Sequence, residues 1–130
     1  MIFSTLILLT LLSPKEQLWR SIMEQESSFQ MWSYCKREDA VGVAQIRPCV
    51  LVDIKQFLGI EVNHTMCYDP YTSKLVWLCY TDLWIGRLGL LGTLEQRARI
   101  WNGGPYGWRK LSTLNYWNSV KSKLYLGDQT

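Results

Sequence analysis

Apolar positions recur every three or four residues along several stretches of the chain, a spacing that places side chains on one face of an α-helix. In the first stretch this face consists of Leu18, Trp19, Ile22 and Met23. The stretch is preceded by Ser13-Pro14-Lys15-Glu16, in which a serine three residues before a glutamate caps a helix whose first position is proline. The pattern therefore predicts a helix that begins near Pro14 and ends at or near Glu26.

Four further helices are predicted from the same periodicity and from residues that begin or end helices. They cover about residues 48–58, 69–86, 93–102 and 115–126. Gly59 is expected to end the first of them, and Thr93 to Gln96 form a second capping box. Residues 28–45 show no sustained period and are predicted to form a loop or a short hairpin. The chain is therefore predicted to be mainly α, with about five helices.

The length of 130 residues leaves room for one small domain with one core. The fractions of hydrophobic residues (48%) and charged residues (19%) are typical of a globular domain. The net charge of +3 suits an anionic partner. No block of like charges and no basic-aromatic repeat occurs, so the sequence argues against nucleic acid as a partner.

The first residues form an apolar segment that differs from the rest. MIFSTLILLTLL carries no charge, and twelve residues are too few to span a bilayer. A secretory signal would carry a basic start and a small-residue cleavage site, and both are missing here. Residues 1–13 are therefore either an atypical export or membrane-touching segment or a first helix packed on the core. Residues 14–130 are predicted to form the domain itself.

The cysteines and aromatic residues bear on the kind of site. No C-x-x-C spacing occurs among the four cysteines, which are Cys35, Cys49, Cys67 and Cys79. The chain also has one histidine, so no metal site is expected. Free thiols are the favoured interpretation, with disulfides as the alternative outside a reducing compartment. Seven tryptophans and seven tyrosines either fill the core or line a cleft where rings stack on sugars.

Three short blocks hold the candidate chemical groups. They are Glu26-Ser27-Ser28-Phe29, the stretch AVGVAQI at 40–46, and the stretch WNGGP at 101–105. In order and spacing, together with Thr113, Tyr116 and Val120, they resemble the soluble lytic transglycosylase family of the lysozyme-like superfamily. The resemblance covers about residues 18–124, and the WNGGP and QIRP stretches are similar to the phage-type variant.

This resemblance implies a lysozyme-like fold, of the kind shared by goose-type lysozymes and soluble lytic transglycosylases. It implies cleavage of the β-1,4 bond between N-acetylmuramic acid and N-acetylglucosamine in peptidoglycan, without a cofactor or metal. Glu26 would be the catalytic general acid and base, and Gln45, Trp101, Asn102 and Tyr116 would bind the glycan. The implied setting is the periplasm, the cell envelope or a phage virion, with residues 1–13 as a candidate membrane or virion attachment.

The role of Asp39 differs between the two reactions considered, transglycosylation and hydrolysis. A lytic transglycosylase needs one carboxyl group, because the sugar's own 6-hydroxyl attacks C1 and forms a 1,6-anhydro end. A hydrolase of this kind normally needs a second carboxylate. Asp39 stands where the family has glycine, among other charged residues, and is interpreted as an exposed loop charge. The lytic transglycosylase is therefore the main hypothesis. The alternatives are a muramidase with Asp39 as second carboxylate, and a weakly active structural or virion-associated wall-binding protein.

Two smaller expectations concern the neighbours of these groups. His64 is predicted to be a surface loop residue with no chemical role. Trp19, Met23, Phe29 and Trp32 are candidates for an apolar pocket around Glu26, because such a pocket raises the pKa of a carboxyl group, as in the well-known lysozyme example.

Overall fold

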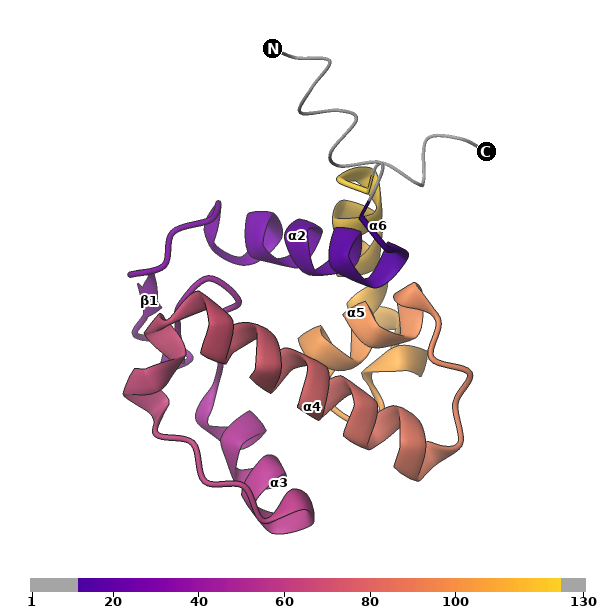
Figure 1. The fold of residues 1–130 in the computed structure, drawn as a ribbon. Coiled ribbons are helices and arrows are strands. Elements are labelled where there is room, and N and C mark those ends of the chain that lie inside the picture. The colour runs from indigo at the N-terminus through magenta and orange to yellow at the C-terminus, as the bar shows by residue number, and fades with distance from the viewer. Residues whose placement is uncertain (1–11, 125–130) are drawn as a thin grey trace. The chain divides into compact units, whose positions relative to one another are not determined.

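Helices account for most of the residues that the computed structural model describes, 12–124 (Figure 1). The α-helices are α2 (Pro14–Ser27), α3 (Pro48–Leu58), α4 (Pro70–Leu88), α5 (Leu94–Gly103) and α6 (Leu114–Ser122). The short 3-10 helices are η1 (His64–Tyr68), η2 (Gly107–Arg109) and η3 (Leu111–Thr113). Two strands, β1 (Tyr34–Cys35) and β2 (Ala40–Val41), form an antiparallel hairpin. The prediction of a mainly α chain with about five helices is confirmed within residues 12–124, and residues 28–45 form the short hairpin rather than only a loop.

Three of the described α-helices, α2, α4 and α5, begin where a side chain satisfies unpaired N–H groups of the first turn. The Ser13 hydroxyl accepts a hydrogen bond from the Glu16 amide at 3.2 Å. The Asp69 carboxylate accepts one from the Thr72 amide at 2.9 Å, and the capping box at Thr93 is complete. The predicted starts of these three helices are therefore confirmed by individual hydrogen bonds, whereas α3 and α6 begin without a side-chain cap.

The predicted ends are less accurate. α3 ends at Gly59, whose left-handed backbone (φ 68°) suits glycine, as predicted. α4 continues past Gly86 and ends at Gly89, which has the left-handed backbone (φ 66°) that Gly86 lacks. α6 already ends at Ser122. A glycine in the sequence marks a helix end only where the backbone takes this conformation, and sequence periodicity does not distinguish the two glycines.

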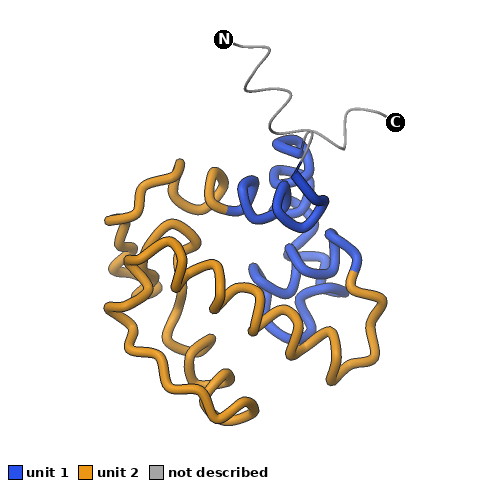
Figure 2. Tube along the Cα trace, in the orientation of Figure 1, with its two compact units in different colours: residues 1–22, 93–130 blue, residues 23–92 orange. Residues whose placement is uncertain are grey.

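The chain forms two compact units, with the boundary between them inside α2 (Figure 2). Unit 1 comprises residues 1–22 and 93–130, and unit 2 comprises residues 23–92. In unit 1, α6 and both short helices η2 and η3 pack against α5. The buried Arg99 joins them, because its guanidinium donates to Glu95, Thr113 and the Lys110 carbonyl at 2.7–2.8 Å.

Unit 2 holds the end of α2, the hairpin, α3, η1 and α4. α3 and η1 both pack against α4, and η1 also packs against β2. The Ser73 hydroxyl at the start of α4 donates to the Cys67 carbonyl of η1 at 2.6 Å, in a buried position. These contacts place η1 beside the hairpin and hold it there.

Several expectations concern the ends of the chain and its thiols. Residues 1–11, and with them most of the apolar segment 1–13, lie outside the described residues, so both interpretations of that segment stay predictions. Within residues 12–124, no helix is long and apolar enough to cross a membrane. All four cysteines are free thiols, as favoured from the sequence. Burial raises the pKa of the Cys67 thiol to about 11, so this group is protonated at neutral pH.

Gly42 gives a prediction about stability. Its backbone is left-handed (φ 83°), and a Cβ added there would collide with the Cys67 carbonyl of η1. Gly42→Ala should therefore lower the free energy of unfolding by more than the ~1–3 kcal/mol of the backbone term alone. Chemical denaturation measures this value. Gly86→Ala is the matched control, because Gly86 has ordinary helical backbone and no neighbour within 4 Å, so this change should leave stability unchanged or raise it. Equal effects at the two positions would contradict the close packing of η1 on the hairpin.

Candidate functional site

The residues predicted to act on a glycan fall into both units (Figure 2). Glu26, Asp39 and Gln45 lie in unit 2. Trp101, Asn102 and Tyr116 lie in unit 1. That both groups line one groove stays a prediction.

Glu26 lies in the last turn of α2 and is half-buried. The helix ends directly after it, because Ser28 and Phe29 both have left-handed backbone (φ 52° and 64°). The Ser27 hydroxyl donates to the Val43 carbonyl at 2.8 Å. The residue next to Glu26 thus ties the end of α2 to the loop that follows β2, and the carboxyl group is presented from a fixed helix end.

Asp39 ends the four-residue turn between β1 and β2. Its backbone is left-handed (φ 51°), a conformation that glycine adopts freely and that aspartate tolerates better than most residues. The Tyr34 hydroxyl donates to Asp39 Oδ1 at 2.8 Å. This hydrogen bond raises the pKa of Tyr34 above its ordinary value, so the hydroxyl keeps the proton that it donates at neutral pH. The side chain of Asp39 is exposed, but it is held in place, which the interpretation as a loop charge did not anticipate.

His64 does not lie in an exposed loop, so that prediction was wrong. It is half-buried at the start of η1, because η1 packs against β2. Its Nε2 lies 2.8 Å from the Ile46 carbonyl oxygen. On the other side of the ring, Nδ1 lies 3.9 Å from Asp39 Oδ2. Sequence reasoning missed this residue because its partners are distant in sequence, and a lone histidine carries no motif.

Gln45 is half-buried and has left-handed backbone (φ 55°). Its side-chain amide nitrogen donates to the Gly42 carbonyl at 3.0 Å and lies 3.4 Å from the Ser33 carbonyl. Its amide N–H groups therefore stabilise the turn that follows β2 and tie it to the residue before β1. Its predicted role in binding glycan stays a prediction.

The uncommon backbone conformations are concentrated in one segment. Among the described residues, the non-glycine residues with positive φ are Ser28, Phe29, Asp39 and Gln45. All four lie in the twenty or so residues that follow Glu26. Such conformations cost free energy and persist where the surrounding structure holds them, most often at functional sites. This segment is therefore the strongest candidate for the site in unit 2.

The apolar pocket expected around Glu26 stays a prediction. Of its four candidates, Trp19 is buried and Met23 is half-buried on α2, whereas Phe29 is 43% exposed and Trp32 is 73% exposed. The Trp32 ring instead pairs with Tyr68 of η1, with ring centroids 5.6 Å apart. Together with Tyr34, which is 50% exposed, they give this part of unit 2 accessible aromatic surface.

The predicted residues of unit 1 lie on two neighbouring helices. Trp101 and Asn102 are on α5, Tyr116 is on α6, and the two helices pack together. Asn102 and Tyr116 are half-buried, whereas Trp101 is only 3% exposed, which leaves little ring surface for a sugar. The glycan-binding roles of all three stay predictions.

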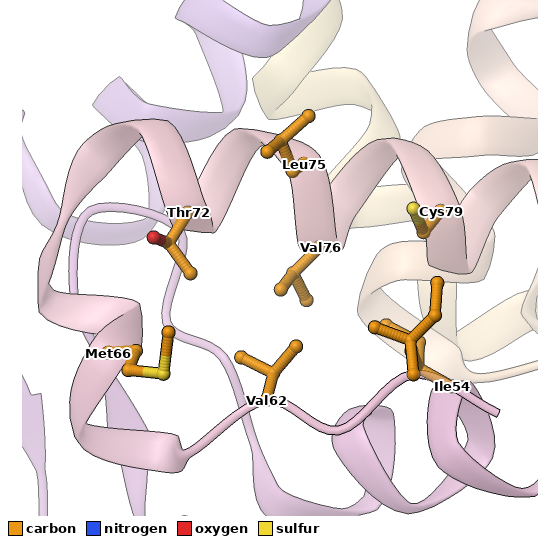
Figure 3. Close-up of a pocket in the computed structure, with 8 residues that line it drawn as sticks. Ile54, Val62, Met66, Thr72, Leu75, Val76 and Cys79 are labelled. Carbon is orange, nitrogen blue, oxygen red and sulfur yellow. The ribbon is translucent and has the colours of Figure 1, made fainter. Parts of the chain in front are cut away.

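Unit 2 also holds an apolar cavity of about 310 Å³ between α3, η1 and α4 (Figure 3). Its lining residues are Ile54, Ile60, Val62, Met66, Thr72, Leu75, Val76 and Cys79. The Thr72 hydroxyl donates to Asp69, so its polar group is already used. The cavity contains no acid or base and is not suited to glycoside chemistry. Within residues 12–124, no cluster of three or more potential ligands forms a metal site.

Comparisons with known proteins identify the fold. The chain matches no family model. It is 40% identical to a lysozyme of Ostrea edulis over 88 residues, which cover 67% of this chain and 62% of that protein. It is 45% identical to a lysozyme of Magallana gigas over 56 residues, which cover 42% of this chain and 40% of that protein. The chain thus spans less than two thirds of each of these two relatives.

A solved structure agrees with these relatives. The fold is similar to a chain in the crystal structure of Aeromonas hydrophila PliI in complex with Meretrix lusoria lysozyme. The TM-score is 0.70 at 24% identity, and the match covers 82% of this chain and 88% of that chain.

These comparisons correct one hypothesis and confirm another. The named relatives are lysozymes, so the hypothesis of a lytic transglycosylase, a lyase that leaves anhydro ends, is wrong. The phage-type variant gains no support, since the relatives come from Ostrea edulis and Magallana gigas. The predicted fold class is confirmed: the chain has a mainly α, lysozyme-like fold.

Proposed function

We propose that the chain is a muramidase, which hydrolyses the β-1,4 bond between N-acetylmuramic acid and N-acetylglucosamine in peptidoglycan. Glu26 is its general acid, and Asp39 is the base that activates water. The similarity to two lysozymes supports hydrolysis rather than transglycosylation. Unit 2 contains both carboxyl groups that such a reaction needs.

Glu26 is assigned the role of proton donor because of its position in the structure. Cleavage of a glycosidic bond requires a proton on the leaving oxygen, and a carboxylic acid at a fixed position supplies it. Glu26 is half-buried at the end of α2, which is anchored through Ser27 to the loop after β2. A group held in this way is positioned to protonate the same oxygen of each bound sugar chain.

The state of Asp39 is the single observation that carries the proposal. The side chain of Asp39 is 54% exposed, but one of its carboxylate oxygens has a fixed partner. Asp39 accepts a hydrogen bond from Tyr34 and has the left-handed backbone that most non-glycine residues avoid. Such backbone conformations cost free energy and occur most often at functional sites, which supports a chemical role for Asp39. In an inverting hydrolase this chemistry is the activation of water opposite the leaving group.

The surroundings of Asp39 suit a sugar substrate. The exposed rings of Trp32 and Tyr34 offer flat apolar surfaces on which pyranose rings stack, with polar groups that bond sugar hydroxyls. The net charge of +3 favours association with the anionic bacterial wall. None of the proposed steps uses a metal or a cofactor.

Mass spectrometry of the fragments released from purified peptidoglycan tests the proposal. Hydrolysis adds one water, so the expected products are muropeptides with reducing N-acetylmuramic acid ends, which borohydride converts to the alditols. Anhydro ends, lighter by one water and inert to borohydride, would overturn it. Heat-denatured protein from the same preparation is the control for contaminating activity.

A further inference from the structure

The ring of His64 has one nitrogen whose role is fixed by its neighbour. Nε2 lies 2.8 Å from the Ile46 carbonyl oxygen, and a carbonyl oxygen only accepts hydrogen bonds. Nε2 therefore carries the hydrogen. In the neutral ring the other nitrogen, Nδ1, is then a bare acceptor.

This acceptor faces a second acceptor. Nδ1 lies 3.9 Å from Asp39 Oδ2, which is too far for a direct hydrogen bond. Oδ1 of the same carboxylate already accepts from Tyr34, so the Tyr34 contact fixes the direction in which Oδ2 points. One water with hydrogen bonds of about 2.8 Å to both acceptors would span this separation at an angle of about 90° at its oxygen, near the angle between its two O–H bonds.

We propose that His64 Nδ1 and Asp39 Oδ2 together bind the water molecule that the reaction consumes, an inference that rests on the proposed muramidase function. Each acceptor takes one of the two hydrogens, which leaves the lone pairs of the water oxygen pointing away from both. His64 is thus a second residue that touches a reacting atom. Its side chain is 25% exposed, so water reaches it.

The reaction balances with these groups. The water oxygen forms a bond to C1 of the N-acetylmuramic acid while the bond from C1 to the bridging oxygen breaks. Glu26 gives its proton to the bridging oxygen, which leaves as a hydroxyl group. Asp39 takes the hydrogen that the water donated to it, and the other hydrogen stays on the new anomeric hydroxyl beside His64. Afterwards Asp39 loses a proton to solvent and Glu26 gains one, which restores the starting state.

Protonation of His64 would stop this step. A charged ring carries a hydrogen on Nδ1, which then donates towards Asp39 Oδ2 and forms an ion pair with it. Nδ1 then no longer accepts a hydrogen bond from the water, and the Asp39 carboxylate is paired with the charged ring. Asp39 and Tyr34 face the site from the hairpin, and Tyr68 faces it from η1. The exposed Lys36, Arg37 and Glu38 of the same turn add charges that salt screens. A site with protonated His64 is therefore expected to be inactive.

The first arm of the test needs no activity. His64 is the only histidine in the chain, so its two ring nitrogens give unambiguous signals in ¹⁵N NMR. At a pH where the ring is neutral, Nε2 should be the protonated nitrogen and Nδ1 the bare one. A ring protonated at Nδ1 would overturn the inference, because Nδ1 would then have no lone pair for the water.

The second arm is a matched pair of variants. His64→Asn places an amide oxygen near the position of Nδ1 and so keeps an acceptor beside Asp39. His64→Gln places an amide nitrogen near the position of Nε2 and so keeps the bond to Ile46, but leaves no acceptor beside Asp39. Loss of one of two hydrogen bonds to the water should lower kcat of His64→Gln about tenfold with little change in KM. His64→Asn should stay within a few-fold of wild type.

The outcomes separate this inference from the proposed function. Full activity and an unchanged pH profile in His64→Gln, with activity lost in Asp39→Asn, would overturn the role of His64 and leave the muramidase standing. Full activity in Asp39→Asn would overturn both. If His64→Asn is the weaker enzyme of the pair, the bond to Ile46 matters more than the acceptor, and the inference is wrong. Thermal unfolding of both variants verifies that they are folded.

Discussion

Glu26→Gln is expected to abolish the release of muropeptides from peptidoglycan while the chain still folds. The glutamine keeps the size and shape of the side chain but has no acidic proton to give to the leaving oxygen. Loss of a general acid costs on the order of a hundredfold or more in rate. The Ser27 hydroxyl holds the end of α2 in both forms, because its hydrogen bond to the Val43 carbonyl does not involve the changed side chain. Release of soluble fragments, quantified by mass spectrometry, gives the rate.

Glu24→Gln is the matched control for this prediction. Glu24 lies on the same helix two positions earlier, is half-buried as well, and undergoes the same chemical change. It should retain activity near the wild-type level, and circular dichroism should show equal helix content in both variants. If Glu26→Gln degrades walls at the wild-type rate, or if Glu24→Gln loses as much, Glu26 is not the acid.

The helices could be predicted because their signals are local. Ser13, Asp69 and Thr93 each satisfy backbone N–H groups within three residues, so the capping is visible in the sequence and recurs in the structure. The contact of His64 with Asp39 has no such signal. It depends on η1 packing against β2, and that packing joins residues from two separate segments. Periodicity and capping rules do not contain this information.

The mistaken reaction type has a related cause. The blocks around Glu26, Gln45 and Asn102 indicate a lysozyme-like fold, and that part of the prediction is confirmed. They do not determine whether water or the sugar's own 6-hydroxyl attacks C1, because hydrolysis and transglycosylation both use Glu26 as the general acid. The decisive residue is Asp39, which the sequence presents as a charged turn residue. Its hydrogen bond to Tyr34 and its left-handed backbone appear only in three dimensions.

The backbone conformation of Asp39 gives a prediction about stability. The φ of Asp39 is 51°, a value at which glycine is favoured. Glycine at this position is therefore expected to keep the conformation of the turn. Asp39→Gly should leave thermal stability nearly unchanged, because relief of about 1 kcal/mol of backbone strain offsets loss of a hydrogen bond worth about 1 kcal/mol.

Asp39→Asn is expected to reduce hydrolysis nearly as much as Glu26→Gln does. Asparagine tolerates left-handed backbone at least as well as aspartate, and its amide oxygen still accepts the hydrogen bond from Tyr34, so the turn is preserved. The amide is not a base, so the attacking water keeps its proton and the step fails. Steady-state rates of muropeptide release measure the loss, with KM near the wild-type value because the shape of the site is unchanged. Glu38→Gln is the control, since Glu38 is an exposed acid in the same turn. A loss of only a few-fold in Asp39→Asn would mean that Asp39 acts through the charge of the site and does not activate water.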